Sequence, residues 1–382
     1  MIKLSEPFFF GDELYYLRKC INDKWISSGG KYTRIFENKI KKFTNGKYNL
    51  GLVNCTSALQ LAVRLLDPKK EDEIILPSIT FVSTTNSVVY NNCKPIFMDC
   101  DDNLLLDKRN FFNFIQSSTY FKKGFTYNKK TKKRIIAIII VNTFGNLFDY
   151  DKKFLSFCRK KNIKIIEDSA ESLGSKYKHK KKINNITFSC YSFNGNKLVT
   201  AGGGGIISTN NKKDYIKAKY LSSQAKRDPI NFVHDDVGYN FRISNIHASI
   251  GLAQLNNLPK ILKKKKIIHN LYIQGLKNIP GLKILKNPKY SLSNNWLNIL
   301  SIDKKKYGLG KKQVIQKFLN LKIETRSLWY PSHLQKPFKK FEKFNIKRSK
   351  DFFERCLCLP SSFSLKTIDQ KKIINCLKTK FL

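Results

Sequence analysis

The stretch CYSFNGNKLVTAGGGGIIST, residues 190–209, decides the fold of this chain. It begins inside an apolar run, 188–193, that has the length and composition of a β-strand, and it ends on a second such run, 206–209. Between the two runs lie a turn rich in Asn and Gly, which ends at Lys197, and four consecutive glycines at 202–205. The glycines lack the spacing of a dinucleotide or P-loop fingerprint. We therefore expect them to let the backbone pass close to a site.

Strands and helices are predicted to alternate on the N-terminal side of this stretch. Apolar runs of strand length occur at 73–76, 95–98, 135–141 and 163–166, and segments with helical spacing occur at 9–25, 33–43, 58–66, 83–90 and 151–161. This alternation is typical of an α/β domain with a largely parallel sheet. The run 135–141 contains no polar residue, so we expect a central strand that is buried on both faces.

The pattern changes towards the C-terminus. A helical segment is predicted at 245–266, and from about residue 268 short strands alternate with Lys-rich helices and turns. We therefore expect a large domain over 1–255 and a smaller α+β domain over 256–382.

Composition limits the class of protein. The chain has 382 residues, of which 41% are hydrophobic, and no apolar run reaches the ~18 residues of a membrane span. The first fourteen residues contain a single Lys followed by acids, which is the wrong order for a signal peptide. The nine cysteines are scattered and odd in number, as expected of buried free thiols rather than a metal site. These features predict a cytoplasmic protein without a metal centre.

The formal net charge of +44 raises the question of a nucleic-acid partner. The positive charge is almost all Lys and is spread along the whole chain, with no basic stripe interleaved with aromatic residues. We therefore expect no nucleic-acid partner, although a positive surface would favour anionic substrates such as nucleotide diphosphates.

Two residues could supply the reactive groups that a cofactor such as pyridoxal 5'-phosphate (PLP) requires, namely an amine and an acid at the ring nitrogen. Lys197 lies in a turn between apolar segments, where a partly desolvated amine would be nucleophilic at neutral pH. Asp168 ends the predicted strand that begins at 163, where parallel-sheet enzymes place functional side chains. Alternatively, Lys197 is a surface lysine and Asp168 caps the next helix.

Four further residues could hold the rest of such a cofactor. Thr56 and Ser57 open a predicted helix, whose first amides and hydroxyls form a site for a phosphate, and Ser192 could add a third hydroxyl. Phe81 could stack on the ring, or it could be an ordinary core aromatic.

Together these residues resemble the sugar aminotransferases of the DegT/DnrJ/EryC1/StrS family, a branch of the fold-type I PLP enzymes, over nearly the whole chain. Residues 190–209 resemble the family's cofactor-attachment segment, with Lys197 in the lysine position. The other similar segments are IIEDSAESLG (165–174), NCTSAL (54–59), PSITFVSTTN (77–86) and VGYNFRISNIHASIGLAQL (237–255).

The resemblance implies a mostly parallel central sheet with a smaller C-terminal α+β domain, and it implies further roles. Glu171 would face the ring hydroxyl or the substrate amine. Asn240 would touch the phosphate of the partner's cofactor, which implies a homodimer with shared active sites. Lys31, Arg326 and His333 would contact the sugar nucleotide near the domain junction.

Within the family the chain is most similar to the legionaminic-acid-type branch, in YFKKGFTYNKKTKKRI (120–135), in Glu171 and in IETRSLWYPSHLQ (323–335). This implies amino transfer from L-glutamate to C4 of a nucleotide-linked 4-keto-6-deoxy sugar, for surface glycan biosynthesis. Two departures concern substrate choice: the stretch between 174 and 188 is short, and Asn142 replaces a common His.

Two alternative functions stay open. A PLP-dependent sugar dehydratase of the same fold carries His in the lysine position, so Lys197 counts against it. A binding protein is the other, either a catalytically retired PLP fold with a regulatory role or a nucleic-acid binder. It predicts that the purified protein does not turn yellow with PLP.

Overall fold

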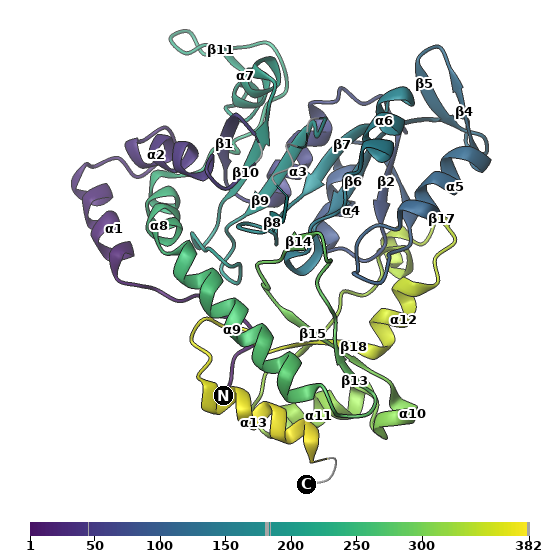
Figure 1. The fold of residues 1–382 in the computed structure, drawn as a ribbon. Helices are drawn as coiled ribbons and strands as arrows, with labels where there is room; N and C mark the ends of the chain where they lie inside the picture. The colour runs from purple at the N-terminus through teal and green to yellow at the C-terminus, as the bar shows by residue number, and fades with distance from the viewer. Residues whose placement is uncertain (45, 180–182, 184, 380–382) are drawn as a thin grey trace.

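The computed structural model describes residues 1–44, 46–179, 183 and 185–379. A large sheet with helices on both faces lies above a smaller sheet (Figure 1). In spatial order the large sheet runs β1 (Tyr48–Leu52), β10 (Gly205–Thr209), β9 (Phe188–Ser192), β7 (Lys164–Asp168), β6 (Arg134–Val141), β2 (Glu73–Pro77), β3 (Lys94–Met98) and β17 (Glu342–Phe344). Neighbours from β9 to β17 pair in parallel, whereas β10 and β1 pair antiparallel at one edge. The predicted α/β class with a mostly parallel central sheet is confirmed.

Strand β6 forms the middle of this sheet. Seven of its eight residues are buried, and it lies between β7 and β2, as predicted for 135–141. Successive side chains of a strand point to opposite faces. Ile139 therefore packs in the cluster that includes Leu59 and Val88, whereas Ile138 and Ile140 pack in a separate cluster on the other face.

Helices cover both faces of the large sheet. They are α3 (Cys55–Arg64), α4 (Val82–Tyr90), α5 (Lys108–Ser118), α6 (Lys152–Lys160) and α7 (Lys212–Leu221), and the hairpin β4 (Thr119–Lys122) and β5 (Phe125–Asn128) extends the sheet beside β6. Most begin at a polar cap: the side chains of Asp107, Asp151 and Asn211 accept hydrogen bonds from first-turn amides of α5, α6 and α7.

The predicted helix 245–266 is wrong in one respect, because the chain forms two helices there. Helix α8 (Asn245–Asn256) ends at Asn257, and α9 (Leu258–Leu276) begins directly afterwards. Pro259 explains the break, since it lacks an N–H and fits only the first turn of a helix. Helices α1 (Asp12–Asn22) and α2 (Lys31–Ile40) pack against α8.

The smaller sheet has its own core. Its strands, in spatial order, are β13 (Leu282–Ile284), β15 (Asn298–Ile302), β18 (Cys356–Leu359) and β16 (Arg326–Ser327), and the helices of this part are α9, α10 (Lys304–Tyr307), α11 (Lys311–Asn320), α12 (Arg348–Arg355) and α13 (Thr367–Lys378). Figure 1 shows α9, α11 and α13 on its lower side. Short elements complete the fold: β8 (Lys176–Tyr177) with β14 (Ser291–Leu292), β11 (Lys226–Asp228) with β12 (Val233–His234), and the 3-10 turns η1 (Thr143–Gly145), η2 (Ser332–Leu334) and η3 (Lys336–Phe338).

Two segments cross between the large and the small sheet. Strand β17 lies far along the chain but pairs with β3 at the edge of the large sheet. Conversely, Ile2 forms a bridge with Ile323 beside the small sheet. The division into 1–255 and 256–382 stays a prediction, and residues 380–382 lie outside the described residues.

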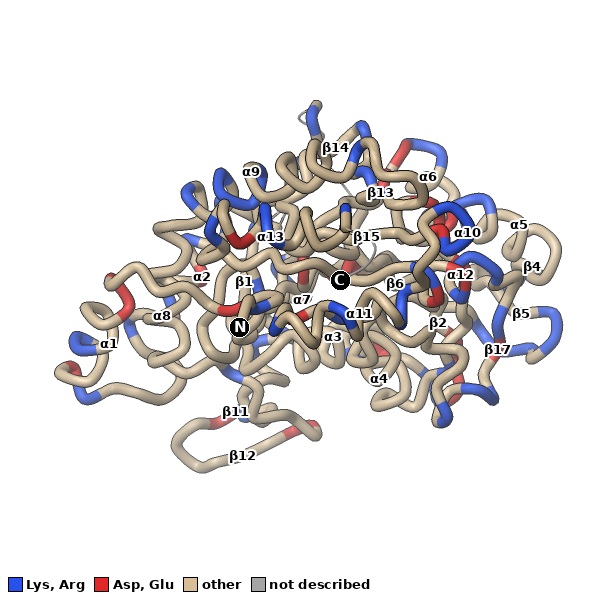
Figure 2. Tube along the Cα trace, turned by 90° about the horizontal axis from the view of Figure 1, so that it is seen from below, with Lys and Arg blue, Asp and Glu red and all other residues tan. Residues whose placement is uncertain are grey.

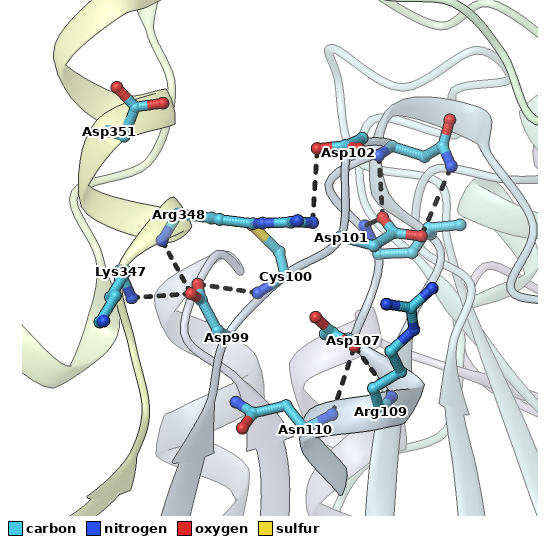
Figure 3. Close-up of polar contacts among 12 residues, drawn as sticks. Asp99, Cys100, Asp101, Asp102, Asp107, Arg109, Asn110, Lys347, Arg348 and Asp351 are labelled. Atoms are coloured by element: carbon cyan, nitrogen blue, oxygen red, sulfur yellow. Dashed lines mark hydrogen bonds and ion pairs between the residues drawn. The ribbon is translucent and has the colours of Figure 1, made fainter.

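The carboxylate of Asp99, the residue directly after β3, links the large sheet to the start of α12. Its two oxygens accept hydrogen bonds from the backbone amides of Lys347, Arg348 and Ser349, at 2.7, 2.7 and 2.8 Å. Figure 3 shows this carboxylate directed at the start of α12. Because the first amides of a helix have no partner within it, Asp99 acts as a cap supplied by another element.

Lys and Arg are spread over the surface. Seen from below, they occur on α1, α9, α10, α11 and α12 and around β17, without forming one continuous stripe (Figure 2). No helix of the described residues is long and apolar enough to cross a membrane.

Candidate active site

A cavity of about 530 Å³ lies at the carboxyl ends of the parallel strands. Asp168 ends β7, Ser192 ends β9, and Phe81 and Phe144 follow β2 and β6, so each of four neighbouring strands brings lining residues to the cavity. This edge is where open parallel sheets bind ligands. Residues of the C-terminal part, among them Trp296, close the opposite side.

Lys197 is directed into this cavity from the loop between β9 and β10. Its side chain is 13% exposed, and its Nζ lies 3.2 Å from Glu171 Oε1 and 4.1 Å from the ring centroid of Trp296. The carbonyl of Asn196 accepts hydrogen bonds from the Trp296 indole at 2.9 Å and from the Ser5 hydroxyl at 3.0 Å. Two donors from distant segments thus hold the backbone next to Lys197, which is not a surface lysine.

The glycines after Lys197 allow a close approach to α3. A Cβ on Gly205 would lie 2.4 Å from the carbonyl carbon of Asn54, the N-cap residue of α3. No side chain fits there, so the expectation that these glycines let backbone pass close to the site is confirmed.

Asp168 is buried and fixed by two donors. Its Oδ2 accepts from the Thr84 hydroxyl at 2.6 Å, and its Oδ1 accepts from the Ala170 amide at 3.1 Å. Burial raises the pKa of the Asp168 carboxyl, and the Thr84 hydroxyl opposes that rise. Asp168 accepts from Ala170 in the turn that follows β7 and does not cap a helix, and it lines the cavity. Its role at a ring nitrogen stays a prediction.

Glu171 is the counter-ion of Lys197. Its other oxygen, Oε2, accepts from the Phe144 amide at 2.8 Å, and its carbonyl accepts from the Asn294 side chain at 2.8 Å. Phe144 has a φ of 55°, a left-handed conformation that is rare for an aromatic residue and typical of functional sites. Burial raises the pKa of the Glu171 carboxyl, and the charge of Lys197 opposes that rise.

The first turn of α3 borders the cavity. Asn54, Cys55 and Thr56 line it, whereas Ser57 does not. The Ser57 amide already donates to the Asn54 side chain at 2.8 Å, so the earlier amides of the helix are the ones left for an anion.

Phe81 and Ser192 also lie at the cavity. Phe81 is 55% exposed, so it is not a core aromatic and its ring is available to a ligand. The Ser192 hydroxyl accepts from the Asn194 amide at 3.4 Å.

The structure brings only one of the three predicted sugar-nucleotide contacts to the cavity. Arg326 lines it and pairs with Glu324 at 3.0 Å. His333 is buried elsewhere, with Nδ1 2.5 Å from the Ser78 hydroxyl, and Lys31 is exposed at the start of α2. Asn240 is exposed and lies outside the cavity lining of its own chain.

Apart from Phe81, the aromatic residues of the cavity were not predicted from the sequence. Trp296, Trp329 and Phe144 all line it, and Phe144 stacks on Trp329 with ring centroids 4.6 Å apart and planes 11° apart. One signal was available, since the chain has three tryptophans and two of them lie here. Asn142, the other substitution noted in the sequence, is buried and bonds to Ser169 at 3.0 Å instead of lining the cavity. The short stretch 174–188 lies partly outside the described residues.

Comparisons with known proteins identify the family of this chain. Residues 11–378 match the DegT/DnrJ/EryC1/StrS aminotransferase family. EpsN of Bacillus subtilis, named by inference as a pyridoxal phosphate-dependent aminotransferase, is 31% identical over 98% of this chain and 95% of its own. The GDP-perosamine synthase of Vibrio cholerae is 31% identical to this chain, over 100% of this chain and 99% of its own. Among solved structures, PseC of Helicobacter pylori, an aminotransferase involved in pseudoaminic acid biosynthesis, has a TM-score of 0.88 to this chain. The match covers 100% of this chain and 99% of PseC at 23% sequence identity, which shows a shared fold.

Proposed function

This chain belongs to the DegT/DnrJ/EryC1/StrS aminotransferase family, and from that membership we propose that it is a PLP enzyme that transfers an amino group from L-glutamate to a nucleotide-linked 4-keto-6-deoxy sugar. The product is a 4-amino sugar for surface glycan biosynthesis. The observation that carries the proposal is the amine of Lys197, whose side chain is only 13% exposed, in one cavity with the buried carboxylate of Asp168.

The residues around Lys197 fit PLP. The cavity combines an amine, a carboxylate on the neighbouring strand end, a helix N-terminus and an available aromatic ring in Phe81. In addition, Asn196 Oδ1 is buried without a hydrogen-bond partner among the described residues, as expected where a polar ligand group is to bind.

Each residue has a defined task in amino transfer. When bound, the cofactor supplies a pyridinium ring that stabilises negative charge at the α-carbon of the amino acid. Asp168 holds the ring nitrogen protonated, and the bonds from Thr84 and Ala170 keep its carboxylate in place. Lys197 holds the cofactor covalently and, once released, moves the proton from the α-carbon.

The remaining residues bind and orient the cofactor and the substrates. Thr56, Ser57 and Ser192 hold the phosphate at the first turn of α3, with the earlier amides of that helix as donors. Phe81 stacks on the ring. Glu171 faces the ring hydroxyl or the substrate amine, and Arg326 contacts the sugar nucleotide. Lys31 and His333 stay weaker candidates for that contact, because neither lines the cavity of its own chain.

We also propose a homodimer with shared active sites. Large apolar side chains are exposed on several segments, including Trp25 at 55%, Val82 at 37% and Tyr90 at 54%. Burial of such side chains favours association with a second subunit. In such a dimer Asn240, which is exposed and does not line the cavity of its own chain, reaches the phosphate of the other subunit's cofactor.

The protein is expected to act in the cytoplasm. All nine cysteines are buried and free, which suits a reducing compartment.

The visible spectrum of the purified protein with PLP tests this function. We expect a yellow protein that excess L-glutamate bleaches to the pyridoxamine form, and a colourless Lys197→Ala variant, since the amine that holds the cofactor is gone. Addition of a UDP- or GDP-linked 4-keto-6-deoxy sugar should then restore the colour and yield a 4-amino sugar by mass spectrometry. A wild-type protein that PLP cannot turn yellow would contradict the proposal and favour a binding role.

A further inference from the structure

The cavity around Lys197 has a polar and an apolar wall. The polar wall belongs to the large sheet and includes Asp168, Glu171 and Asn194. The C-terminal part of the chain supplies the apolar wall, made by Trp296, Leu297, Trp329 and Cys358, and it also contributes Arg326 and Ser327 to the lining. Because the cofactor would occupy the polar wall, the apolar wall is left to the substrate.

Three aromatic rings form a stack along the apolar wall. Phe144 stacks with both tryptophans: its centroid lies 4.6 Å from that of Trp329 and 6.2 Å from that of Trp296, and the planes differ by only 11° and 13°. Trp296 is 4% exposed and already contacts Lys197, and Phe144 is 5% exposed. Trp329 is the half-buried member of the stack, so it has the most indole surface left for a ligand.

We propose that Trp329 determines specificity at C6 of the sugar, by binding the apolar edge that C5–H and a C6 methyl group form in a 6-deoxy sugar. This inference rests on the proposed function and adds a residue that selects the substrate. The stack with Phe144 fixes the plane of the Trp329 ring, which lowers the entropy cost of binding.

The same wall would discriminate against a sugar that carries a 6-hydroxyl group. That hydroxyl would leave water for the part of the lining that ring faces, Leu297 and Cys358 form, apart from the polar side chains of Arg326 and Ser327, and a hydroxyl buried there without a partner is costly. Apolar pockets reject an added hydroxyl only moderately, so we expect a preference of about 10- to 100-fold for the 6-deoxy sugar.

Stable amino sugars allow a direct test in the reverse half-reaction. A nucleotide-linked 4-amino-4,6-dideoxyhexose and the corresponding 4-amino-4-deoxyhexose, which keeps the 6-hydroxyl, are each given to the PLP-loaded protein. Loss of the yellow colour gives a second-order rate for each sugar. Calorimetric dissociation constants of both sugars for the cofactor-free protein provide a second ratio that does not depend on catalysis.

The ratios are compared among the wild type, Trp329→Leu, Trp329→Phe and Tyr330→Leu. Tyr330 is the matched control, because it is 44% exposed, packs on Phe353 and does not line the cavity. Trp329→Leu should reduce the preference to within a few-fold, Trp329→Phe should retain most of it, and Tyr330→Leu should leave it unchanged. Both sugars are measured on one preparation, so partial misfolding cancels in the ratio.

The outcomes separate this inference from the proposed function. A wild type that reacts with both sugars equally, or a Trp329→Leu variant with an unchanged ratio, would overturn the role of Trp329 while leaving the aminotransferase intact. If glutamate bleaches the wild type but neither amino sugar does, then the substrate is not such a sugar. That result would overturn the sugar part of the proposed function and this inference with it.

Discussion

Gly205 is the residue at which the loop that carries Lys197 comes nearest to the first turn of α3. A methyl group there would lie within 2.6 Å of Asn54 and Cys55 backbone atoms, which cannot rotate away as a side chain can. Gly205→Ala should therefore push α3 away from β10. We expect a loss of about 1–3 kcal/mol in the free energy of unfolding by urea, and weaker binding of PLP, because α3 carries the proposed phosphate site.

Gly195 provides the control for this substitution. It lies in the same loop, but an added Cβ there meets nothing within 4 Å. Gly195→Ala should leave unfolding and PLP binding close to those of the wild type. Equal effects of the two substitutions would show that the loop, rather than its contact with α3, is sensitive.

At the scale of single residues, the sequence predicted the polar side of the cavity better than the apolar side. Asp168 and Ser192 end strands, and the carboxyl ends of parallel strands meet at one edge, so pattern alone places them together. Trp296 and Trp329 come from irregular segments around the small sheet, and their packing on Phe144 depends on how the two sheets meet. His333 shows the opposite error, since its contact with Ser78 takes it away from the cavity lining.

Asp99 and α12 form the junction between elements that we expect to be most sensitive to pH. Although burial acts to raise it, hydrogen bonds from Ser349, Lys347 and Arg348 hold the pKa of the Asp99 carboxyl below its ordinary value. A carboxyl with a depressed pKa in the folded state stabilises the protein fully above the pKa of the unfolded state, about 3.9, and this contribution is lost as the pH falls through the folded-state pKa.

Asp99→Asn should lower the free energy of unfolding at pH 7 by about 1–3 kcal/mol, since an amide leaves buried N–H groups of α12 without an acceptor. The difference from the wild type should begin to shrink as the pH falls below about 3.9, and it should be smallest below the depressed folded-state pKa, where the folded wild-type carboxyl is itself protonated. Urea unfolding of both proteins at about pH 7 and at a series of lower pH values measures this difference. Asp102 is the control: its side chain is 84% exposed and forms an ion pair with the Arg348 guanidinium at 3.4 Å (Figure 3). Asp102→Asn should change stability by less than about 1 kcal/mol, with little dependence on pH.

Among elements, long apolar strands were predictable and helix boundaries were less so. The composition of β6 leaves it no stable position except the middle of a sheet. The break between α8 and α9 depends on one residue, Pro259, inside a segment whose apolar spacing continues through it. Strand β17 could not be predicted from the sequence, because its residues, EKF, have no apolar pattern and their partner β3 is distant along the chain.

At the scale of the whole molecule, the position of Asn240 is not explained by contacts within a single subunit. The resemblance to the family gives Asn240 a cofactor contact, yet it does not line the cavity of its own subunit. A two-fold dimer would account for both the implied cofactor contact and the position outside the cavity, because each subunit would then complete the site of the other. The exposed apolar side chains of Trp25 and Tyr90 agree with such an interface.

Subunit mixing tests this arrangement. Lys197→Ala removes the amine, and Asn240→Ala should weaken PLP binding, so each variant alone is nearly inactive at limiting PLP. In a mixed dimer, the site that keeps Lys197 receives an intact Asn240 from the other subunit. After unfolding and joint refolding half of the dimers are mixed, and half of their sites are complete, so about a quarter of the wild-type activity should return.

The control for this experiment is to mix the two folded variants without refolding, which should restore activity only as fast as subunits exchange. If Asn240 served its own chain, joint refolding would give no more than the sum of the two variants, because no subunit would then have both residues. Light scattering on the same samples separates this result from a failure to dimerise. A monomer without recovery would contradict the dimer itself, whereas a dimer without recovery would contradict only the sharing of sites and would leave the role of the exposed Asn240 with its own subunit.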